Sequence, residues 1–470
     1  MTMPVPLLAW VRTPVVPRHG ALRHHLPHTL AAPLVTHLLQ QTGLPPAAVD
    51  ALLLGNALGA GGNPARMTAL AAGLPLRCMT MTVETQCCSG LDAILMAATQ
   101  ILAGQADVVI AGGSEAWSRA PIRQHRPTRT GEAAQPYERP PFTPWPERDP
   151  DPLLAAAAYA ARHGWTRTQQ DAYARQSHAH ALMHPGDGIL ALQAQPRGCN
   201  HGGGTCTRAD ADANARSGSG NDDRRSAAAP TISADTYPRP LSDRQLQRMP
   251  ILMAEPPDPD GAAAPEGPGC AISRLAVSPQ ADGAALVLLA SERACRQHGL
   301  HPSAWWQAGL ALGTDPETPL TGAWEAAAAL LAREHATARQ LDAVAVQGLA
   351  FAHALQQQGV DPSRLNAWGG GLARGHPIGA SGAIALVQLL ARLRHRAGAT
   401  TCADATIRAA ATASACTEAI RTSRPPRQKP RLFPAHPGDR LGLACIAGAG
   451  GLGSAALVSV AGTPPGQRSG

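Results

Sequence analysis

The feature of this sequence that most constrains its fold is an internal repeat. Three pairs of segments match in the same order, 50–55 with 342–348, 87–90 with 379–382, and 108–112 with 444–448. In each half a short apolar strand ending in Gly precedes a Ser-Gly step that opens an apolar helix, and a second apolar run follows. A repeated unit of this kind predicts two similar α/β halves packed together, with both helix N-termini at one central cleft.

Helix and strand patterns alternate through both halves. After Cys87 the apolar residues recur with a period near 3.6, and Gly104 is the expected end of that helix. Helices are also expected at 30–41, from 67, within 153–184 with Thr166 as an N-cap, and at 324–331. A buried strand is expected at 49–54, and either a strand or the start of a short helix at 281–290. This alternation predicts a parallel or mixed sheet covered by helices.

Two segments interrupt the pattern. Residues 196–230 have almost no large apolar side chain and are expected to be a disordered insertion. Residues 398–438 contain a basic, proline-rich run and are expected to be a second insertion. The expected domains are an N-terminal half at 1–118 with 266–290, an inserted loop and substrate domain at 119–265, and a C-terminal half at 291–470.

Charge and cysteine content narrow the function classes. The formal charge of +7 is carried by arginines spread through loops, and only 3% of residues are aromatic, which argues against a nucleic-acid partner. An anionic small molecule is one explanation of the charge, and a codon bias toward Ala, Arg, Gly and Pro is the other. Ten scattered cysteines and the lack of a long apolar stretch favour a cytoplasmic protein without a membrane span.

Cys87 is the candidate nucleophile. It lies where a strand turns into a buried helix, and the positive end of the helix dipole there is expected to favour thiolate over thiol. The alternative is that Cys87 and Cys88 are two small buried hydrophobic residues. The repeat brings His376 from the second half toward Cys87, and a Cys–His pair suits nucleophilic acyl transfer. Cys445 is expected at the same rim, as a general acid and base.

These residues resemble the thiolase family, whose members form or cleave 3-ketoacyl-CoA esters. The family motif Val-Asn-x-x-Cys-x-Ser-Gly is similar to residues 83–90, and Ala-Gly-Gly-x-Glu-x-x-Ser is similar to residues 111–118. Further similar motifs follow in family order at 12–14, 55–56, 63–66, 282–285, 366–370 and 375–377. The resemblance implies an acetyl-CoA acetyltransferase or 3-ketoacyl-CoA thiolase, with central mixed sheets in a layered α-β-α-β-α fold.

The resemblance also implies a role for each candidate site residue. Cys87 would take the acyl group as a thioester, His376 would activate it, and Cys445 would exchange a proton with the acetyl-CoA enolate. The N–H of Cys87 and a glycine N–H in the turn after Cys445 would form one oxyanion hole. Gln347 would stand in for the family's Asn in the other, and Ser278 would lie near the CoA pantetheine. CoA and acyl-CoA would be substrates, no metal or redox cofactor would be needed, and the chain would form a homodimer or homotetramer.

Several positions depart from the family pattern. Gln347 replaces the motif's Asn, Arg374 replaces an apolar residue before Gly-His-Pro, and the glycine turn after Cys445 is longer than usual. If the family motif is aligned on the last glycines of this turn, Ala447 takes the place of the family's cysteine. The internal repeat instead puts Cys445 in that place. Two alternatives to a thiolase therefore stay open: an acyl-CoA-binding protein with impaired catalysis, and a biosynthetic Claisen-condensing enzyme.

One cluster of possible metal ligands does not predict a metal site. Cys199, His201 and Cys206 lie close together in the sequence, but they stand in a glycine-rich coil without a fourth ligand. No metal is therefore expected.

Overall fold

In a computed structural model of the chain, the residues described are 3–59, 61–186, 188–194, 230–253, 271–346, 359–397 and 439–462. Apart from Pro230, the two expected insertions at 196–230 and 398–438 lie outside these ranges. Gln347 also lies outside them.

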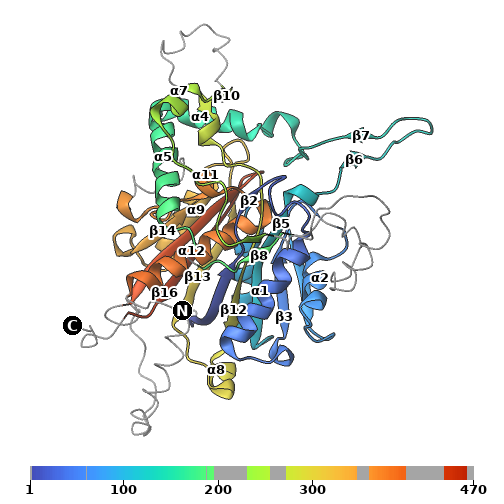
Figure 1. The fold of residues 1–470 in the computed structure, drawn as a ribbon, viewed down its shortest axis with the longest axis vertical. Helices are drawn as coiled ribbons and strands as arrows, with labels where there is room; N and C mark the ends of the chain where they lie inside the picture. The colour runs from blue at the N-terminus through green and yellow to red at the C-terminus, as the bar shows by residue number, and fades with distance from the viewer. Residues whose placement is uncertain are drawn as a thin grey trace, which may run out of the picture.

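A ten-stranded mixed sheet forms the centre of the molecule (Figure 1). The first half supplies β1 (Val5–Arg12), β3 (Ala51–Gly55), β4 (Met79–Val83), β5 (Val108–Ala116) and β12 (Ala281–Ala290). The second half supplies β13 (Ala304–Gly313), β14 (Ala343–Val346), β15 (Arg440–Gly448) and β16 (Leu452–Val460). The short strand β2 (Val16–Pro17) pairs with β12.

The internal repeat is also present in the order of the strands in the sheet. This order runs β4-β3-β5-β12-β1-β13-β16-β15-β14. In the first half β3 is parallel to β5, which is antiparallel to β12, which is antiparallel to β1. In the second half β14, β15, β16 and β13 repeat that sequence of pairings. A short antiparallel pairing of β1 with β13 joins the two halves edge to edge.

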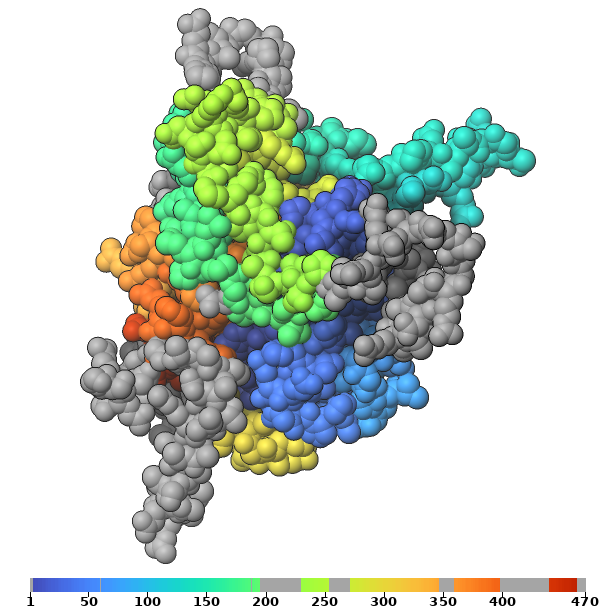
Figure 2. Space-filling view, viewed as in Figure 1, coloured from blue at the N-terminus to red at the C-terminus, as the bar shows by residue number. Residues whose placement is uncertain are grey.

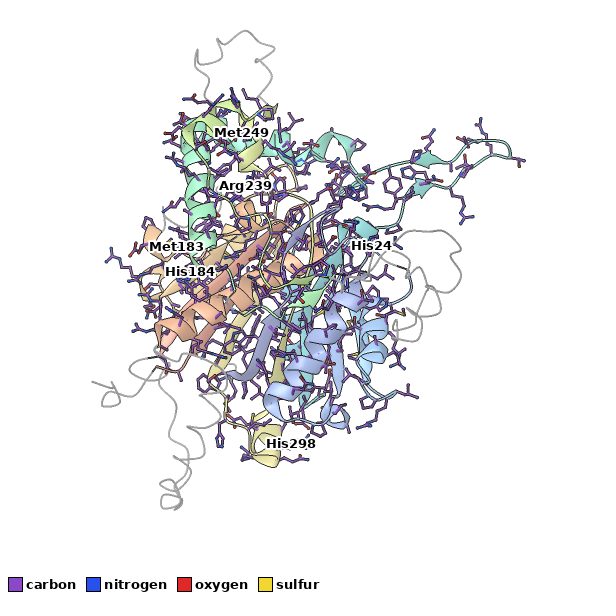
Figure 3. The ribbon with its side chains drawn as sticks, in the orientation of Figure 1. His24, Met183, His184, Arg239, Met249 and His298 are labelled. Carbon is purple, nitrogen blue, oxygen red and sulfur yellow. The ribbon has the colours of Figure 1, made fainter. Side chains whose placement is uncertain are left out.

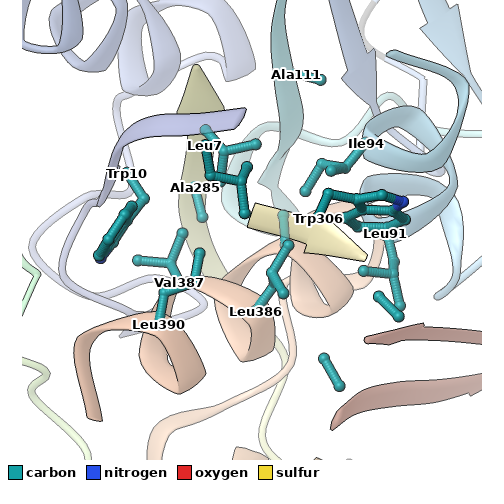
Figure 4. Packing of buried hydrophobic residues seen from close by; sticks show 14 of the residues in the cluster. Leu7, Trp10, Leu91, Ile94, Ala111, Ala285, Trp306, Leu386, Val387 and Leu390 are labelled. Atoms are coloured by element: carbon teal, nitrogen blue, oxygen red, sulfur yellow. The ribbon is translucent and has the colours of Figure 1, made fainter. Parts of the chain in front are cut away.

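The helices of the two halves form three layers around the sheet. Helices α1 (Pro27–Thr42) and α2 (Pro64–Ala71) cover the outer face of the first half, and α9 (Gly322–Arg333) covers that of the second. Helices α3 (Ser89–Leu102) and α12 (Ser381–Arg396) lie side by side in the middle, and strands of both halves pack on them. Figure 4 shows Leu91 and Ile94 on one side of this core and Leu386, Val387 and Leu390 on the other. The predicted α-β-α-β-α layering is confirmed.

Glycines let the two central helices approach closely. The carbonyl oxygen of Gly379, just before α12, lies where a Cβ on Gly113, Gly55 or Gly90 would stand, at 2.2, 2.7 and 2.7 Å from those ideal Cβ positions. No side chain larger than hydrogen fits at these contacts without backbone movement. The glycines of the repeat therefore set the distance between the N-termini of α3 and α12.

Capping residues explain where several helices begin. Thr166 accepts a hydrogen bond from Gln169 N, so the predicted N-cap of α5 (Arg167–Met183) is confirmed. Asn63 caps α2, and Pro64 occupies its first turn, which moves the start ahead of the predicted residue 67. Helix α1 likewise begins at Pro27, before the predicted residue 30.

The segment between β5 and β12 lies over one end of the sheet. It contains α4 (Pro152–Arg162), α5 and α7 (Asp243–Arg248), together with the short strand pairs β6–β7, β8–β9 and β10–β11. Their bounds are Gln124–His125, Gln135–Pro136, Leu192–Gln193, Thr231–Ile232, Ile251–Met253 and Ile272–Ser273. The β6–β7 hairpin extends as an arm away from the body (Figure 2). The exact boundaries of an inserted domain stay a prediction.

The remaining α-helices of the described residues are short. They are α8 (Glu292–His298), which follows β12, and α11 (Gly371–Arg374), which precedes the Gly-His-Pro motif. Every helix in the described part of the chain falls short of the length and hydrophobicity that crossing a bilayer requires.

Candidate active site

Cys87 and His376 meet at the centre of the molecule. Cys87 follows β4 and precedes α3, as predicted, and its Sγ lies 3.2 Å from His376 Nε2. The two residues are 289 positions apart in the chain and come from different halves. The predicted Cys–His pair is therefore formed, and its distance is within the reach that nucleophile and base need.

Neighbouring groups of both halves hold His376 in place. Its backbone N–H donates to Pro279 O at 2.8 Å, and its carbonyl accepts from Trp117 Nε1 at 3.1 Å. Its ring Nδ1 lies 2.7 Å from Ser381 Oγ, and the Ser381 hydroxyl donates to Pro377 O. Because the Ser381 hydroxyl proton is donated to Pro377 O, Ser381 Oγ accepts a hydrogen bond from His376 Nδ1–H. His376 Nε2 is then unprotonated and faces the Cys87 thiol as an acceptor.

Burial keeps both partners neutral at rest. Burial raises the pKa of the Cys87 thiol to about 12, although the N–H groups of Ala449 and of Cys87 itself donate toward the sulfur and oppose the rise. Burial also lowers the pKa of His376 to about 4. This shift is opposite in direction to the predicted preference for thiolate, because desolvation outweighs the hydrogen bonds that these N–H groups donate. Neutral imidazole faces neutral thiol, and the thiol proton can pass to Nε2 as the sulfur attacks.

The loop that carries Cys87 is braced by a buried carboxylate. Asp92, in the first turn of α3, accepts from Thr85 Oγ1 and from Ser454 Oγ of β16, each at 2.6 Å. Ser89 Oγ accepts from Thr85 N. These bonds tie the nucleophile loop to a strand of the other half.

A second buried carboxylate links the halves near the sulfur. Glu115 accepts from Asn56 Nδ2 at 2.7 Å, from Ala57 N at 2.9 Å and from Gly379 N at 3.0 Å. Burial raises the pKa of Glu115 to about 7 despite these donors. Glu115 therefore fixes the turn before α12 against the loop after β3.

A cavity of about 410 Å³ opens over the Cys87–His376 pair. Most of its wall is apolar, and much of it comes from the segment between β5 and β12. The side chains from that segment include Phe142, Leu153, Ala156, Tyr159, Ala160 and Trp165. Ser278, which the resemblance placed near the pantetheine of CoA, lines the same cavity. Such a mostly apolar pocket with few polar groups is typical of a small-molecule site.

The structure does not bring Cys445 to this cavity. Cys445 lies inside β15, is 1% exposed, and packs among the apolar residues beneath α9. Burial raises its pKa to about 12. Ala447, two residues later, lines the cavity instead, followed by Gly448 and Ala449. The expected placement of Cys445 at the rim is corrected: β15 continues to Gly448, so Ala447, near the end of the strand, reaches the cavity in place of Cys445.

Arg374 has a structural role that the sequence did not indicate. It is 3% exposed and ion-pairs with the buried Asp235, which also pairs with Arg12 at 2.7 Å. Burial acts to raise the pKa of Asp235, but the charges of Arg12 and Arg374 prevail and lower it. Arg374 also donates to the carbonyls of Trp368 and of His184, which follows α5 (Figure 3). The departure from an apolar residue thus anchors the segment before His376.

Three contributors to the site escaped sequence reasoning. Ser381 could have been found, since it stands five residues after His376 and in the matched Ser-Gly step. Ala449 acts through its backbone N–H, which carries no sequence signal. The role of Asp92 depends on a strand of the other half. Among the described residues, no three His, Cys, Asp or Glu side chains gather closely enough to hold a metal ion, and Cys199, His201 and Cys206 lie outside them.

Comparisons with known proteins agree with this arrangement. The family models described as "Thiolase, N-terminal domain" and "Thiolase, C-terminal domain" match residues 5–223 and 300–419. The "Putative acetyl-CoA C-acetyltransferase VraB" of Staphylococcus epidermidis is 30% identical over 382 residues, which cover 80% of this chain and 89% of that relative. The "Putative acetyl-CoA C-acetyltransferase YhfS" of Bacillus subtilis is 30% identical over 383 residues, covering 81% and 89%.

Solved structures share the fold. The acetyl-CoA acetyltransferase of Bacillus anthracis superposes with a TM-score of 0.73 at 24% identity, over 98% of this chain and 99% of that one. Human mitochondrial 3-ketoacyl-CoA thiolase in complex with CoA superposes with a TM-score of 0.71 at 21% identity, over 97% and 98%.

Proposed function

This chain belongs to the thiolase family, and from that premise we propose that it is an acyl-CoA C-acyltransferase. It cleaves 3-ketoacyl-CoA with CoA, or condenses two acyl-CoA molecules, through an acyl thioester on Cys87. The observation that carries the proposal is the 3.2 Å contact between Cys87 Sγ and His376 Nε2 at the base of an apolar cavity.

The geometry supports the first half of this reaction directly. As Cys87 Sγ attacks C3 of 3-ketoacyl-CoA, Nε2 of His376 takes the thiol proton. The C2–C3 bond then breaks, acetyl-CoA leaves as its enolate and takes up one proton at C2, and His376 returns to its neutral form. Negative charge develops on the carbonyl oxygen beside the sulfur, and the N–H groups of Cys87 and Ala449, which donate toward that sulfur, are the nearby donors. Two backbone donors in this position stabilise such an oxyanion. The predicted glycine N–H of this oxyanion hole is here the N–H of Ala449.

The second half-reaction returns the enzyme to its free state. The CoA thiol attacks the thioester, the bond from the acyl carbon to Cys87 Sγ breaks, and the CoA proton passes through His376 to that sulfur. These steps need neither a metal nor a redox cofactor. Ser278 lines the cavity, and we propose that it contacts the pantetheine arm of CoA.

The setting of the enzyme follows from the same premise. We propose that it acts in the cytoplasm, in fatty acid metabolism, as a homodimer or homotetramer. Edge strand β4 supports self-association: among the described strands it pairs with β3 alone, and its Met79 and Met81 are 39% and 36% exposed. Exposed apolar side chains on a sheet edge favour pairing with another chain.

Thiolysis of acetoacetyl-CoA by added CoA tests the proposed reaction. We expect activity in the wild type, a mass increase of one acyl group on Cys87, and loss of both in Cys87→Ala. The matched control is Cys295→Ala, which removes a buried thiol from α8, away from the cavity. Activity that survives Cys87→Ala would contradict the mechanism. A wild type that is neither active nor acylated would instead favour an acyl-CoA-binding protein.

A further inference from the structure

Strand β15 presents an alanine, Ala447, to the cavity over Cys87. Alternate side chains of β15, among them Leu443, Cys445 and Ala447, face the apolar cluster beneath α9. Only the last of these three reaches the cavity over Cys87. Residues two apart on a strand are separated by about 6.6 Å. Cys445 therefore lies one step deeper in the sheet, sealed from substrate.

The other titratable side chains that line the described part of the cavity have different positions or partners. The carboxylate of Asp149 accepts from Arg139 at 2.5 Å and from Phe142 N at 3.1 Å. Tyr159 stands on α4, with its ring centroid 4.3 Å from that of His163. Within this part of the site, His376 is the proton carrier that touches Cys87.

The two half-reactions differ in where a proton must go. When an acyl group moves from CoA to Cys87, a C–S bond forms, a C–S bond breaks, and the proton moves from one sulfur to the other. His376 can carry this proton, because the entering sulfur and the leaving sulfur are bonded to the same acyl carbon. When 3-ketoacyl-CoA is cleaved, the C2–C3 bond breaks and its electron pair remains on C2. That carbon, on the leaving fragment, must then receive a proton.

We propose that Ala447 occupies the place from which a side chain would exchange the C2 proton, so that this enzyme transfers acyl groups between thiols faster than it cleaves or forms carbon–carbon bonds. The inference rests on the proposed function and specifies its acceptor preference. A positioned acid or base contributes roughly 10²–10⁴ in rate. The carbon–carbon step is therefore the slow step here, by about that factor.

Two assays on one enzyme preparation separate the steps. The first follows exchange of labelled CoA into acetyl-CoA, which needs only the thioester on Cys87. The second follows thiolysis of acetoacetyl-CoA, which also needs the proton at C2. We expect exchange in the wild type to exceed thiolysis by about 100-fold or more.

Substitutions in β15 then test which of its positions can supply the proton at C2. We expect Ala447→Cys to raise thiolysis about tenfold or more while exchange changes by less than about threefold, since its sulfur projects into the cavity. The matched control Ala447→Ser adds a side chain of similar shape whose hydroxyl is a far weaker acid, and it should not raise thiolysis. Cys445→Ala should leave the ratio of the two rates unchanged.

Several results would overturn the inference. Wild-type thiolysis as fast as exchange would do so, as would loss of thiolysis alone in a folded Cys445→Ala. If Ala447→Cys does not fold, deuterium uptake from D₂O at C2 of acetyl-CoA decides the matter in the wild type: uptake as fast as exchange contradicts the proposal, and much slower uptake supports it. Absence of exchange and of Cys87 acylation would overturn the proposed function itself, and the first assay reads this separately.

Discussion

At the scale of single residues, Cys87 and His376 have pKa values shifted away from each other. The thiol pKa is raised to about 12 and the imidazole pKa is lowered to about 4, both by burial. A thiolate–imidazolium pair needs the opposite order of pKa values. The sulfur therefore becomes nucleophilic only as its proton leaves, which makes the reaction depend on the position of Nε2.

This state predicts the pH dependence of Cys87 chemistry. Alkylation by iodoacetamide should rise steadily with pH up to about pH 9 without a plateau, because the thiolate fraction keeps increasing below a pKa of about 12. Enzyme turnover should persist at pH 5, because His376 with a pKa of about 4 is still mostly neutral there. Mass spectrometry of Cys87 and initial rates measure the two. An alkylation plateau near pH 7 would show a stable thiolate instead.

Ser381 is a positioning residue for the base. Ser381→Ala removes the oxygen that accepts from Nδ1–H, and a lost hydrogen bond of about 1.5 kcal/mol corresponds to roughly tenfold in rate. We expect kcat to fall by that factor with little change in KM, and the slope of rate against pH to change because the ring is no longer held in one tautomer. Thr99→Ala, on the exposed side of α3, is the control. An unchanged kcat and pH profile would assign Ser381 to packing alone.

At the scale of elements, the ion cluster of Asp235 fastens the inserted segment to both halves. Arg12 ends β1, Arg374 ends α11, and all three side chains are at most 3% exposed. Removing one partner of a buried pair leaves an uncompensated charge, at a cost of about 3–5 kcal/mol. We expect Asp235→Asn to lower the free energy of unfolding in urea by about that amount.

The control for Asp235 is an ion pair of the same kind on the surface. Asp243, 82% exposed, pairs with Arg175, and Asp243→Asn should cost less than about 1 kcal/mol. Because the Asp235 pKa is lowered in the folded protein, its stabilisation is present above the ordinary Asp pKa and is lost as the pH falls below it. Equal effects of the two substitutions would contradict the role of the cluster.

The contact between the turn before α12 and strand β5 depends on glycine. A Cβ on Gly113 would stand 2.2 Å from Gly379 O, a backbone atom. The clash could therefore be relieved only by moving the main chain. Gly113→Ala should therefore lower the free energy of unfolding by about 1–3 kcal/mol and reduce turnover, because it displaces the turn that follows His376. Gly186→Ala, where a Cβ meets no atom within 4 Å, is the control. Thermal unfolding and initial rates measure both effects.

At the scale of the whole molecule, the site exists only because two halves assemble. Cys87 comes from the first half, and His376 and the Ala449 N–H come from the second. The carboxylates of Glu115 and Asp92 each bind groups of both halves. Loss of packing between the halves should thus abolish activity before either half unfolds.

Self-association through β4 is testable at this scale. Met81→Lys places a charge on the exposed edge, and a lysine there opposes strand pairing between copies. We expect light scattering after gel filtration to show a lower mass for this variant than for the wild type. Leu102→Lys, at the 42% exposed end of α3, should keep the wild-type mass. An unchanged mass for Met81→Lys would place any interface elsewhere.

The sequence by itself determined the repeated α/β architecture and the pairing of Cys87 with His376. Both depend on local patterns, namely apolar periodicity and Ser-Gly steps that recur at matched positions, and these survive in one dimension. The cap of α5 is of the same kind. The predictions for 196–230, 398–438 and Gln347 fall outside the described residues, and the domain bounds stay a prediction.

Only the tertiary structure decided which residue of β15 reaches the substrate and how the site is charged. Cys445 and Ala447 share one face of the strand, so their order in the sequence could not tell which lies at the cavity. The protonation state of Cys87 depends on burial, which arises when the two halves and the inserted segment close over it. Packing between distant segments determines how deeply a side chain is buried and how polar its surroundings are, and neither can be predicted from the neighbouring residues in the sequence.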